Sequence, residues 1–292
     1  MSFNFLEYVE RKKEPERGRD EATGFGDYAF SGDIRVLRQI QRASPVRVVA
    51  ESAVRFWKTM EKNELLGKSV KVTRRQFPSL YENVVDCAET LDVAPPTVYV
   101  SQNPVLNAGT YGTDTEAFII LNSALVDKFD ETELKFVLGH ECGHLQNNHV
   151  VYHTAAQFLA QGVVSFVRWA VAPAQVALSA WSRRGEITCD RAGLLCCRDE
   201  EVAYNSIMKI AVGSDKLMEE VDLEEYMLQL EDLQSGLGRV KEYFEDHPYL
   251  PKRIRALKLF ADSEYYRNAI GERGGRALDE VDREVEELVK VL

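Results

Sequence analysis

The sequence predicts an α+β fold that is mainly helical, with a small antiparallel sheet directly before one central helix. Two observations predict this fold class. Apolar residues recur at helical spacing in segments spread over most of the chain. Three short β-rich runs lie close together between residues 97 and 121 and are bounded by turn residues. We therefore expect many helices around a single small sheet.

The first half of the chain is expected to hold two helical segments and then the strands. Residues 34–66 show a mostly helical pattern with a break at Ser44-Pro45. Residues 80–91 form the next helix, and Pro95-Pro96 closes it. The strands are expected at 97–101, 106–112 and 117–121.

The central helix carries the pattern with the clearest chemistry. Asp130 followed by Glu133 is typical of a capping pair at a helix start. Further along, His140, Glu141 and His144 spell H-E-x-x-H. Residues four apart share a helix face, so both imidazoles can point at one place and form half of a tetrahedral zinc site. Glu141 lies one step round the helix, where it can act as a base on metal-bound water.

A second pair of residues can complete this site. Glu186 and Asp190 are also four apart, so they share a helix face. Glu186 can serve as the third zinc ligand, and Asp190 can accept the free ring N–H of a ligand histidine. For an isolated E-x-x-x-D, a solvated helix face is the better interpretation. Its position after an H-E-x-x-H helix favours the metal site instead.

These motifs together resemble the M48 gluzincin metallopeptidases, the group that includes the HtpX proteases. The resemblance runs from about Val84 to Leu259. It rests on H-E-x-G-H-x-x-x-x-H and E-x-x-x-D-R-A-G in that order. Further matches are Asn107-Ala108-Gly109, the strand and turn at 119–125, Asp246-His247-Pro248 and Arg253-Ile254.

The resemblance implies a zinc endopeptidase that cleaves proteins or peptides, with a possible place in protein quality control. It implies one Zn²⁺ per chain held by His140, His144 and Glu186. Glu141 would be the general base, Asp190 would orient a ligand, and His247 would donate to the developing oxyanion. The runner-up interpretation is a latent or non-cleaving zinc-bearing scaffold or interaction protein.

Two further residues are candidates for substrate binding. In the gluzincin arrangement an extended peptide pairs with an exposed sheet edge, which we place around residues 107–111 with Asn107 near the peptide backbone. The alternative is that Asn107 is only a turn residue. Arg253 can hold a carboxylate of the site or bind substrate, and the alternative is a surface ion pair.

The net charge, the cysteine content and the N-terminal sequence indicate which partners and which cellular compartment to expect. A net charge of −11 over 292 residues argues against a nucleic-acid partner. Five cysteines, including neighbours, do not resemble a disulfide framework and favour a reducing compartment. The charged N-terminus has no apolar segment typical of a secretory signal. We therefore expect a cytoplasmic protein that can associate with a membrane.

The expected organisation is one peptidase domain over residues 27–292, ending in helices, after a flexible arm at 1–26. An arm that covers the cleft would keep a protease latent, and the alternative is a plain tail. Residues 154–181 are apolar but interrupted by polar residues such as Arg168. We expect two packed helices there, the second starting near Pro173. Peripheral membrane contact or self-association through this segment is the alternative.

Overall fold

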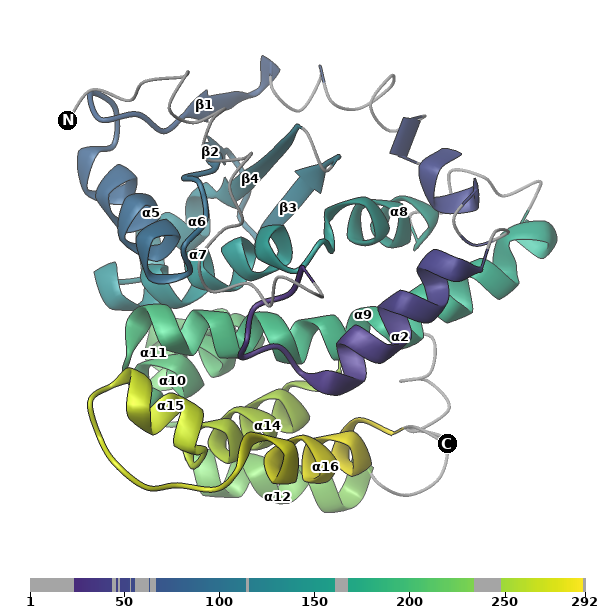
Figure 1. Cartoon of the computed structure of the whole chain (residues 1–292). Coiled ribbons are helices and arrows are strands. Elements are labelled where there is room, and N and C mark those ends of the chain that lie inside the picture. The colour runs from purple at the N-terminus through teal and green to yellow at the C-terminus, as the bar shows by residue number, and fades with distance from the viewer. Residues whose placement is uncertain are drawn as a thin grey trace.

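Two long helices, α7 (Glu131–Gln146) and α9 (Arg168–Cys197), lie between a small sheet and a group of C-terminal helices in the computed structural model (Figure 1). The structure describes residues 24–43, 46, 48–52, 54, 55, 63, 67–113, 116–160, 168–233 and 248–290. The other helices are α2 (Ser31–Arg42), α5 (Pro78–Thr90), α6 (Ser123–Lys128), α8 (Val150–Ala160), α10 (Glu200–Val212), α11 (Asp215–Met218), α12 (Leu223–Leu233), α14 (Leu250–Ala261), α15 (Glu264–Ala269) and α16 (Leu278–Val289). This confirms a mainly helical α+β fold.

The sheet has four strands in the order β1-β2-β4-β3. They are β1 (Ser69–Lys71), β2 (Thr97–Ser101), β3 (Ala108–Gly112) and β4 (Ala117–Asn122). Strands β3 and β4 form the expected antiparallel hairpin. Strands β2 and β4 run parallel, however, so the prediction of an antiparallel sheet is wrong for this pair. Because the chain crosses past β4 before forming β3, β3 becomes an edge strand of a mixed sheet.

Helix α7 starts where the sequence predicts. The Asp130 carboxylate accepts from the N–H groups of Thr132 and Glu133, both at 2.8 Å. The Glu133 carboxylate in turn accepts from the Asp130 N–H at 2.8 Å. This reciprocal capping box satisfies N–H groups that have no partner within the helix. The helix start, and with it the position of every residue further along α7, is therefore well defined.

Helices α7 and α9 pack closely because glycine stands at the contact. A Cβ atom at Gly139 would lie 2.7 Å from Cys196 Cβ, and one at Gly143 would lie 2.9 Å from Ala192 Cβ. On the facing helix, a Cβ atom at Gly193 would lie 2.7 Å from the Phe136 carbonyl oxygen. Since glycine costs a helix about 1 kcal/mol relative to alanine, close approach explains its use here. The short spacing brings the side chains of α7 and α9 together.

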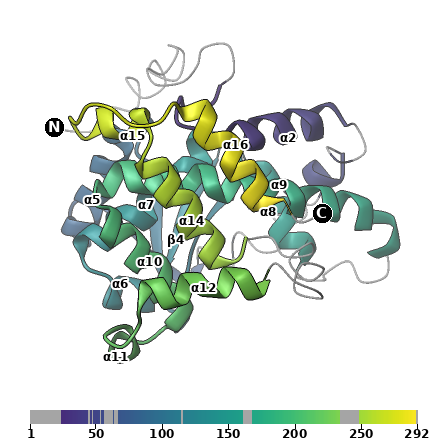
Figure 2. The same ribbon diagram turned by 90° about the horizontal axis from the view of Figure 1, so that it is seen from below.

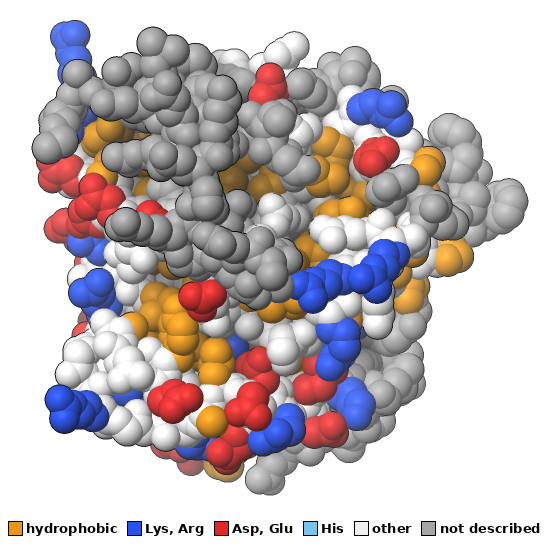
Figure 3. All heavy atoms as spheres, viewed as in Figure 1, with side chains coloured by type: hydrophobic (Ala, Val, Ile, Leu, Met, Phe, Trp, Pro, Cys, Tyr) orange, Lys and Arg blue, Asp and Glu red, His pale blue; other side chains and the backbone are white. Residues whose placement is uncertain are grey.

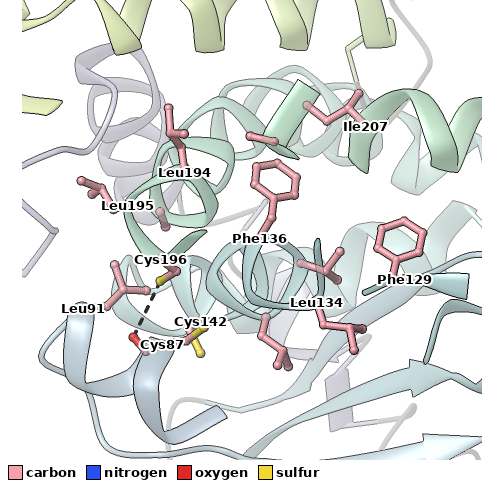
Figure 4. Close-up of a cluster of buried hydrophobic side chains, with 14 of the residues drawn as sticks. Cys87, Leu91, Phe129, Leu134, Phe136, Cys142, Leu194, Leu195, Cys196 and Ile207 are labelled. Atoms are coloured by element: carbon pink, nitrogen blue, oxygen red, sulfur yellow. Dashed lines mark hydrogen bonds between the residues drawn. The ribbon is translucent and has the colours of Figure 1, made fainter. Parts of the chain in front are cut away.

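A hydrophobic core surrounds this helix pair. Figure 4 shows side chains of α5, α7, α9 and α10 meeting around Phe136, with the Cys196 thiol donating to the Cys87 carbonyl oxygen at 3.8 Å. Leu138 and Leu194 are fully buried. Burying a side chain of this size contributes about 1.5–3 kcal/mol. Because the core holds both helices, it also holds the metal-site side chains that they carry.

The segment at 154–181 agrees with the prediction of packed helices in part. Helix α8 covers its beginning, and α9 covers its end. Pro173 lies inside the first turns of α9 and does not start that helix, so the expected boundary is wrong. A proline inside a helix removes one backbone hydrogen bond, here the bond to the carbonyl group of Trp169. Over the described residues, the structure contains no helix with the length and apolar character needed to cross a membrane.

The C-terminal helices cover the far side of α9, as the view from below shows (Figure 2). Helices α10, α12, α14 and α16 lie in the C-terminal part of the chain, where the sequence predicts helices. Acidic and basic side chains are interspersed along the lower part of the face in Figure 3, where the C-terminal helices lie. The first 23 residues of the expected arm and His247 lie outside the described residues. At the described end of the arm, Phe25 is buried and the Gly26 N–H donates to Asn147 Oδ1 at 2.9 Å.

Candidate metal centre and active site

Three buried donors from α7 and α9 converge at the centre of the helix pair. His140 and His144 lie on one face of α7, and Glu186 faces them from α9. His140 Nε2 lies 3.5 Å from Glu186 Oε2, and His144 Nε2 lies 3.5 Å from Glu186 Oε1. The structure therefore brings together the three residues that the sequence nominates as ligands.

Two of the distances in this group are close to those between ligand atoms around a zinc ion. Zinc binds histidine nitrogen and carboxylate oxygen at roughly 2.0–2.2 Å, so neighbouring ligand atoms of a tetrahedron lie about 3.4 Å apart. Both distances from the histidine Nε2 atoms to Glu186 are 3.5 Å. Two other buried donors lie nearby. Cys189 forms a group with His140 and His144, and His153 forms a group with His144 and Glu186. Within each group the ligand atoms lie within 4.8 Å of one another. These buried groups could hold a metal ion, although His140, His144 and Glu186 together are not one of them.

Asp190 and Arg253 hold the outer side of this centre. His140 Nδ1 lies 3.0 Å from Asp190 Oδ1. Arg253, from α14, donates to Asp190 twice, from Nε at 2.8 Å and from Nη2 at 2.6 Å. Its Nη1 atom also lies 3.4 Å from Glu186 Oε2. A two-pronged Arg–carboxylate pair fixes both position and direction, so Asp190 can orient the His140 ring.

Burial and neighbouring charges lower the pKa values of Asp190 and His144 and raise the pKa of His140. Burial opposes ionisation of Asp190, but the Arg253 guanidinium outweighs it and holds the pKa of the carboxyl below its usual range. Burial also lowers the pKa of His140, yet Glu186 and Asp190 raise it overall. The pKa of His144 is well below its usual value, first because of burial and then because of His153. A neutral His144 keeps a lone pair for a metal.

Glu141 lies beside the two histidines and is tied to the sheet. Thr110, fully buried on β3, donates its hydroxyl toward Glu141 Oε2 at 2.6 Å and lies 3.2 Å from the Glu141 carbonyl oxygen. No sequence motif includes Thr110, and its one signal is its place in a strand that precedes the H-E-x-x-H helix. This contact joins the candidate base to the strand at the sheet edge.

The sequence pattern of peptidase family M48 matches residues 74–261, which is more than half of the chain. The chain belongs to peptidase family M48. It is 34% identical over 170 residues to the plastoglobule-localized metallopeptidase 48 of Arabidopsis thaliana, an alignment that covers 57% of this chain and 49% of that relative. This chain thus spans about half the length of that relative.

Bacterial relatives match a longer part of the chain at lower identity. The protease HtpX homolog of Dictyoglomus turgidum is 23% identical over 220 residues, covering 65% of this chain and 72% of the relative. The HtpX homolog of Streptococcus pneumoniae serotype 19F is 25% identical over 227 residues, covering 64% and 75%. No solved structure matches the chain.

In this M48 chain a second set of contacts reaches His144 from the N-terminal helix. His144 Nδ1 lies 3.2 Å from His149 Nδ1, and His149 Nε2 lies 3.0 Å from Asp33 Oδ2 of α2. His153 stacks on His144 with ring centroids 4.5 Å apart. From the sequence, His149 and His153 could be surface residues or could lie behind the ligands; both are buried against His144, so the surface alternative is wrong. No spacing in the sequence connects Asp33 to this site.

Of the remaining nominated residues, Asn107 is described by the structure and His247 is not. Asn107 is exposed directly before β3, and its carbonyl oxygen accepts from the Asn122 N–H at 3.0 Å. His247 lies outside the described residues, although the next residue, Pro248, is buried. Burial raises the pKa of the Cys142 and Cys189 thiols well above its usual value. Both thiols are therefore protonated at neutral pH, in keeping with small buried side chains.

Proposed function

We propose that the chain is a zinc-dependent metalloendopeptidase that hydrolyses peptide bonds in proteins. The observation that carries the proposal is the convergence of His140 Nε2 and His144 Nε2 on the two oxygens of Glu186, each 3.5 Å away. One Zn²⁺ per chain fits these donors. When bound, zinc supplies an activated water molecule and polarises the scissile carbonyl.

Glu141 is the proposed general base. Its carboxylate takes a proton from the attacking water and delivers that proton to the leaving amine. The contact with Thr110 supports this role, because a hydroxyl 2.6 Å from Oε2 fixes the direction of the carboxylate. We propose that Arg253 acts by holding Asp190 and Glu186, in line with its burial and its contacts to both. His247 is proposed as the donor to the oxyanion.

The edge strand β3 is the proposed binding site for an extended substrate. Asn107 accepts a hydrogen bond from β4. Since strand residues alternate, the backbone groups of Ala108 and Thr110 point away from β4. The Gly112 N–H, also on this outer side, donates to Thr154 Oγ1 of α8 at 3.2 Å. A peptide paired beside the half-buried Ala108 would have Asn107 near its backbone, and the fully buried Thr110 links this strand to Glu141.

Unfolded proteins are the substrates that this mode of binding favours, because backbone pairing requires an extended chain and little side-chain specificity. This agrees with a place in protein quality control. The test is cleavage of casein by the purified full chain, with bound zinc quantified and Glu141→Gln as the control. We expect about one zinc per chain in both proteins and loss of cleavage only in the variant. Zinc without cleavage in the wild type would favour the latent scaffold.

A further inference from the structure

One edge of the sheet is basic in a chain that is acidic overall. The whole sequence carries 47 Asp and Glu residues against 36 Lys and Arg residues, but residues 65–81 contain four Lys or Arg residues and no Asp or Glu. Strand β1 and the turn after it lie in this stretch. Its exposed cationic and large apolar side chains, here called the basic edge, are Lys68, Val70, Lys71, Arg74, Arg75 and Phe77.

The backbone places two arginines at the tip of a tight turn. The Thr73 N–H donates to the Gln76 carbonyl oxygen at 2.9 Å, and the Gln76 N–H donates to the Thr73 carbonyl oxygen at 3.0 Å. This pair closes a two-residue turn with Arg74 and Arg75 at its tip. Gln76 Nε2 also donates to the Lys71 carbonyl oxygen at 2.6 Å and ties the turn to β1. The cationic side chains therefore extend from a convex projection.

Two large apolar side chains are exposed among these cations. Val70 is 47% exposed and Phe77 is 41% exposed. Phe77 has φ 61° and ψ 58° directly before α5, a left-handed conformation that a bulky residue rarely adopts. Its carbonyl oxygen accepts from the Tyr81 N–H at 2.9 Å, so the first turn of α5 holds this conformation in place. A strained backbone that keeps an aromatic side chain exposed beside cations indicates a contact surface.

The basic edge lies apart from the proposed substrate strand. The strand order β1-β2-β4-β3 puts β1 and β3 at opposite edges of the sheet. Figure 1 shows β1 at the upper margin of the molecule and the C-terminal helices at the lower margin. At physiological ionic strength, exposed charges more than about 8 Å apart are largely screened from one another. The basic edge can therefore meet an anionic surface although the net charge is −11.

We propose that the basic edge docks the chain on an anionic lipid surface. Its cations are attracted to the headgroups, and Val70 and Phe77 supply the apolar contact that enters the interface. The shape favours this partner, because a lipid surface accommodates a convex turn, whereas small molecules bind in concave sites. The docked chain presents β3 at the sheet edge opposite to the membrane. The inference does not depend on the proposed zinc centre.

Flotation of the purified full chain with lipid vesicles tests the proposal. We expect binding to vesicles of equal parts phosphatidylglycerol and phosphatidylcholine, and release at about 1 M salt, where the screening length falls to about 3 Å. The double variant Lys71→Glu/Arg75→Glu should lower the partition coefficient about 25-fold or more, because each cation near an anionic surface contributes about fivefold. Equal binding of the wild type to vesicles of phosphatidylcholine alone would overturn the proposal.

The matched control is Lys216→Glu/Arg283→Glu. It changes the net charge by the same amount at exposed cations of α11 and α16. We expect its partition coefficient to stay within about twofold of wild type, since these charges lie beyond the screening length from the docked surface. Equal losses in the two double variants would show attraction by overall charge alone and would overturn the basic edge as the docking site.

Phe77→Asn tests the apolar contact separately from the charge. Asparagine adopts the left-handed conformation more readily than phenylalanine, so the melting temperature should stay equal or rise. Vesicle binding should nevertheless fall several-fold, because the apolar ring is lost. Unchanged binding would overturn the contribution of Phe77. Binding of the wild type to a polyglutamate peptide but not to anionic vesicles would overturn the lipid surface in favour of an acidic protein partner.

Discussion

Replacing Gly143 with alanine tests whether the close packing of α7 on α9 sets the spacing of the metal donors. A Cβ atom there would lie 2.9 Å from Ala192 Cβ and 3.1 Å from Cys189 Cα. Non-bonded carbon atoms prefer roughly 3.5–4.0 Å, so the helices must separate locally by about 0.5–1 Å. The distance from His144 Nε2 to Glu186 Oε1, now 3.5 Å, would then exceed the spacing that a zinc ion bridges.

The cost of this substitution has two parts. Overpacking a helix contact costs about 1–3 kcal/mol, and alanine recovers about 1 kcal/mol through its helix propensity. The net loss of unfolding free energy is therefore about 0–2 kcal/mol, measured by urea unfolding of the metal-free chain. Zinc affinity, measured by competition with a chelator, should fall by about tenfold or more, comparable to the loss of a group that orients a ligand.

Gly67→Ala is the control for the helix stability that alanine gains over glycine. Gly67 is exposed and helical, and a Cβ atom there would meet no other atom within 4 Å. This variant should keep wild-type zinc affinity and equal or slightly higher stability. A Gly143→Ala protein that behaves like Gly67→Ala, with unchanged zinc affinity and raised stability, would refute the reasoning.

Three further outcomes follow from the site. Thr110→Val removes the hydroxyl 2.6 Å from the Glu141 carboxylate, so kcat on a peptide substrate should fall about tenfold with zinc content unchanged, and an unaltered kcat would contradict a role for Thr110. Arg253→Leu leaves Asp190 in a buried site without its cation, and urea unfolding at pH 7 should show a loss of about 3–5 kcal/mol. Because Arg253 lowers the pKa of Asp190 in the folded state, that contribution is complete above the unfolded pKa of about 3.9 and is lost as the pH falls through the folded value. The difference between wild type and Arg253→Leu should therefore shrink as the pH falls below about 4, and a constant difference would contradict the assignment. Burial holds the Cys189 thiol protonated, so alkylation at pH 8 should require unfolding, and rapid alkylation of the native chain would contradict its burial.

The parts of the site that the sequence predicts are those set by spacing along one helix. His140 and His144 are four apart on α7, and Glu186 and Asp190 are four apart on α9. A helix fixes which residues share a face, so each pair could be placed before the fold was known. The capping pair at the start of α7 could also be predicted from the sequence, because Asp130 and Glu133 are only three positions apart.

The parts that the sequence does not predict depend on which elements meet. Asp33 reaches His149 across 116 positions of the chain, and Thr110 reaches Glu141 from a strand. Local patterns carry no signal for such contacts. The same limit explains the sheet, because Thr97–Ser101 looks identical whether it pairs with a parallel or an antiparallel neighbour.

Zinc-edge X-ray absorption of the full chain loaded with one equivalent of zinc tests the central claim most directly. The account predicts nitrogen and oxygen neighbours at about 2.0–2.2 Å, from His140, His144, Glu186 and one water, with no sulfur. The measurement can distinguish two ligand sets because the Cys189 thiol is also close to the site. The ligand atoms of Cys189, His140 and His144 lie within 4.8 Å of one another. A sulfur neighbour at about 2.3 Å would show that the thiolate binds the metal, and it would contradict the proposed ligand set.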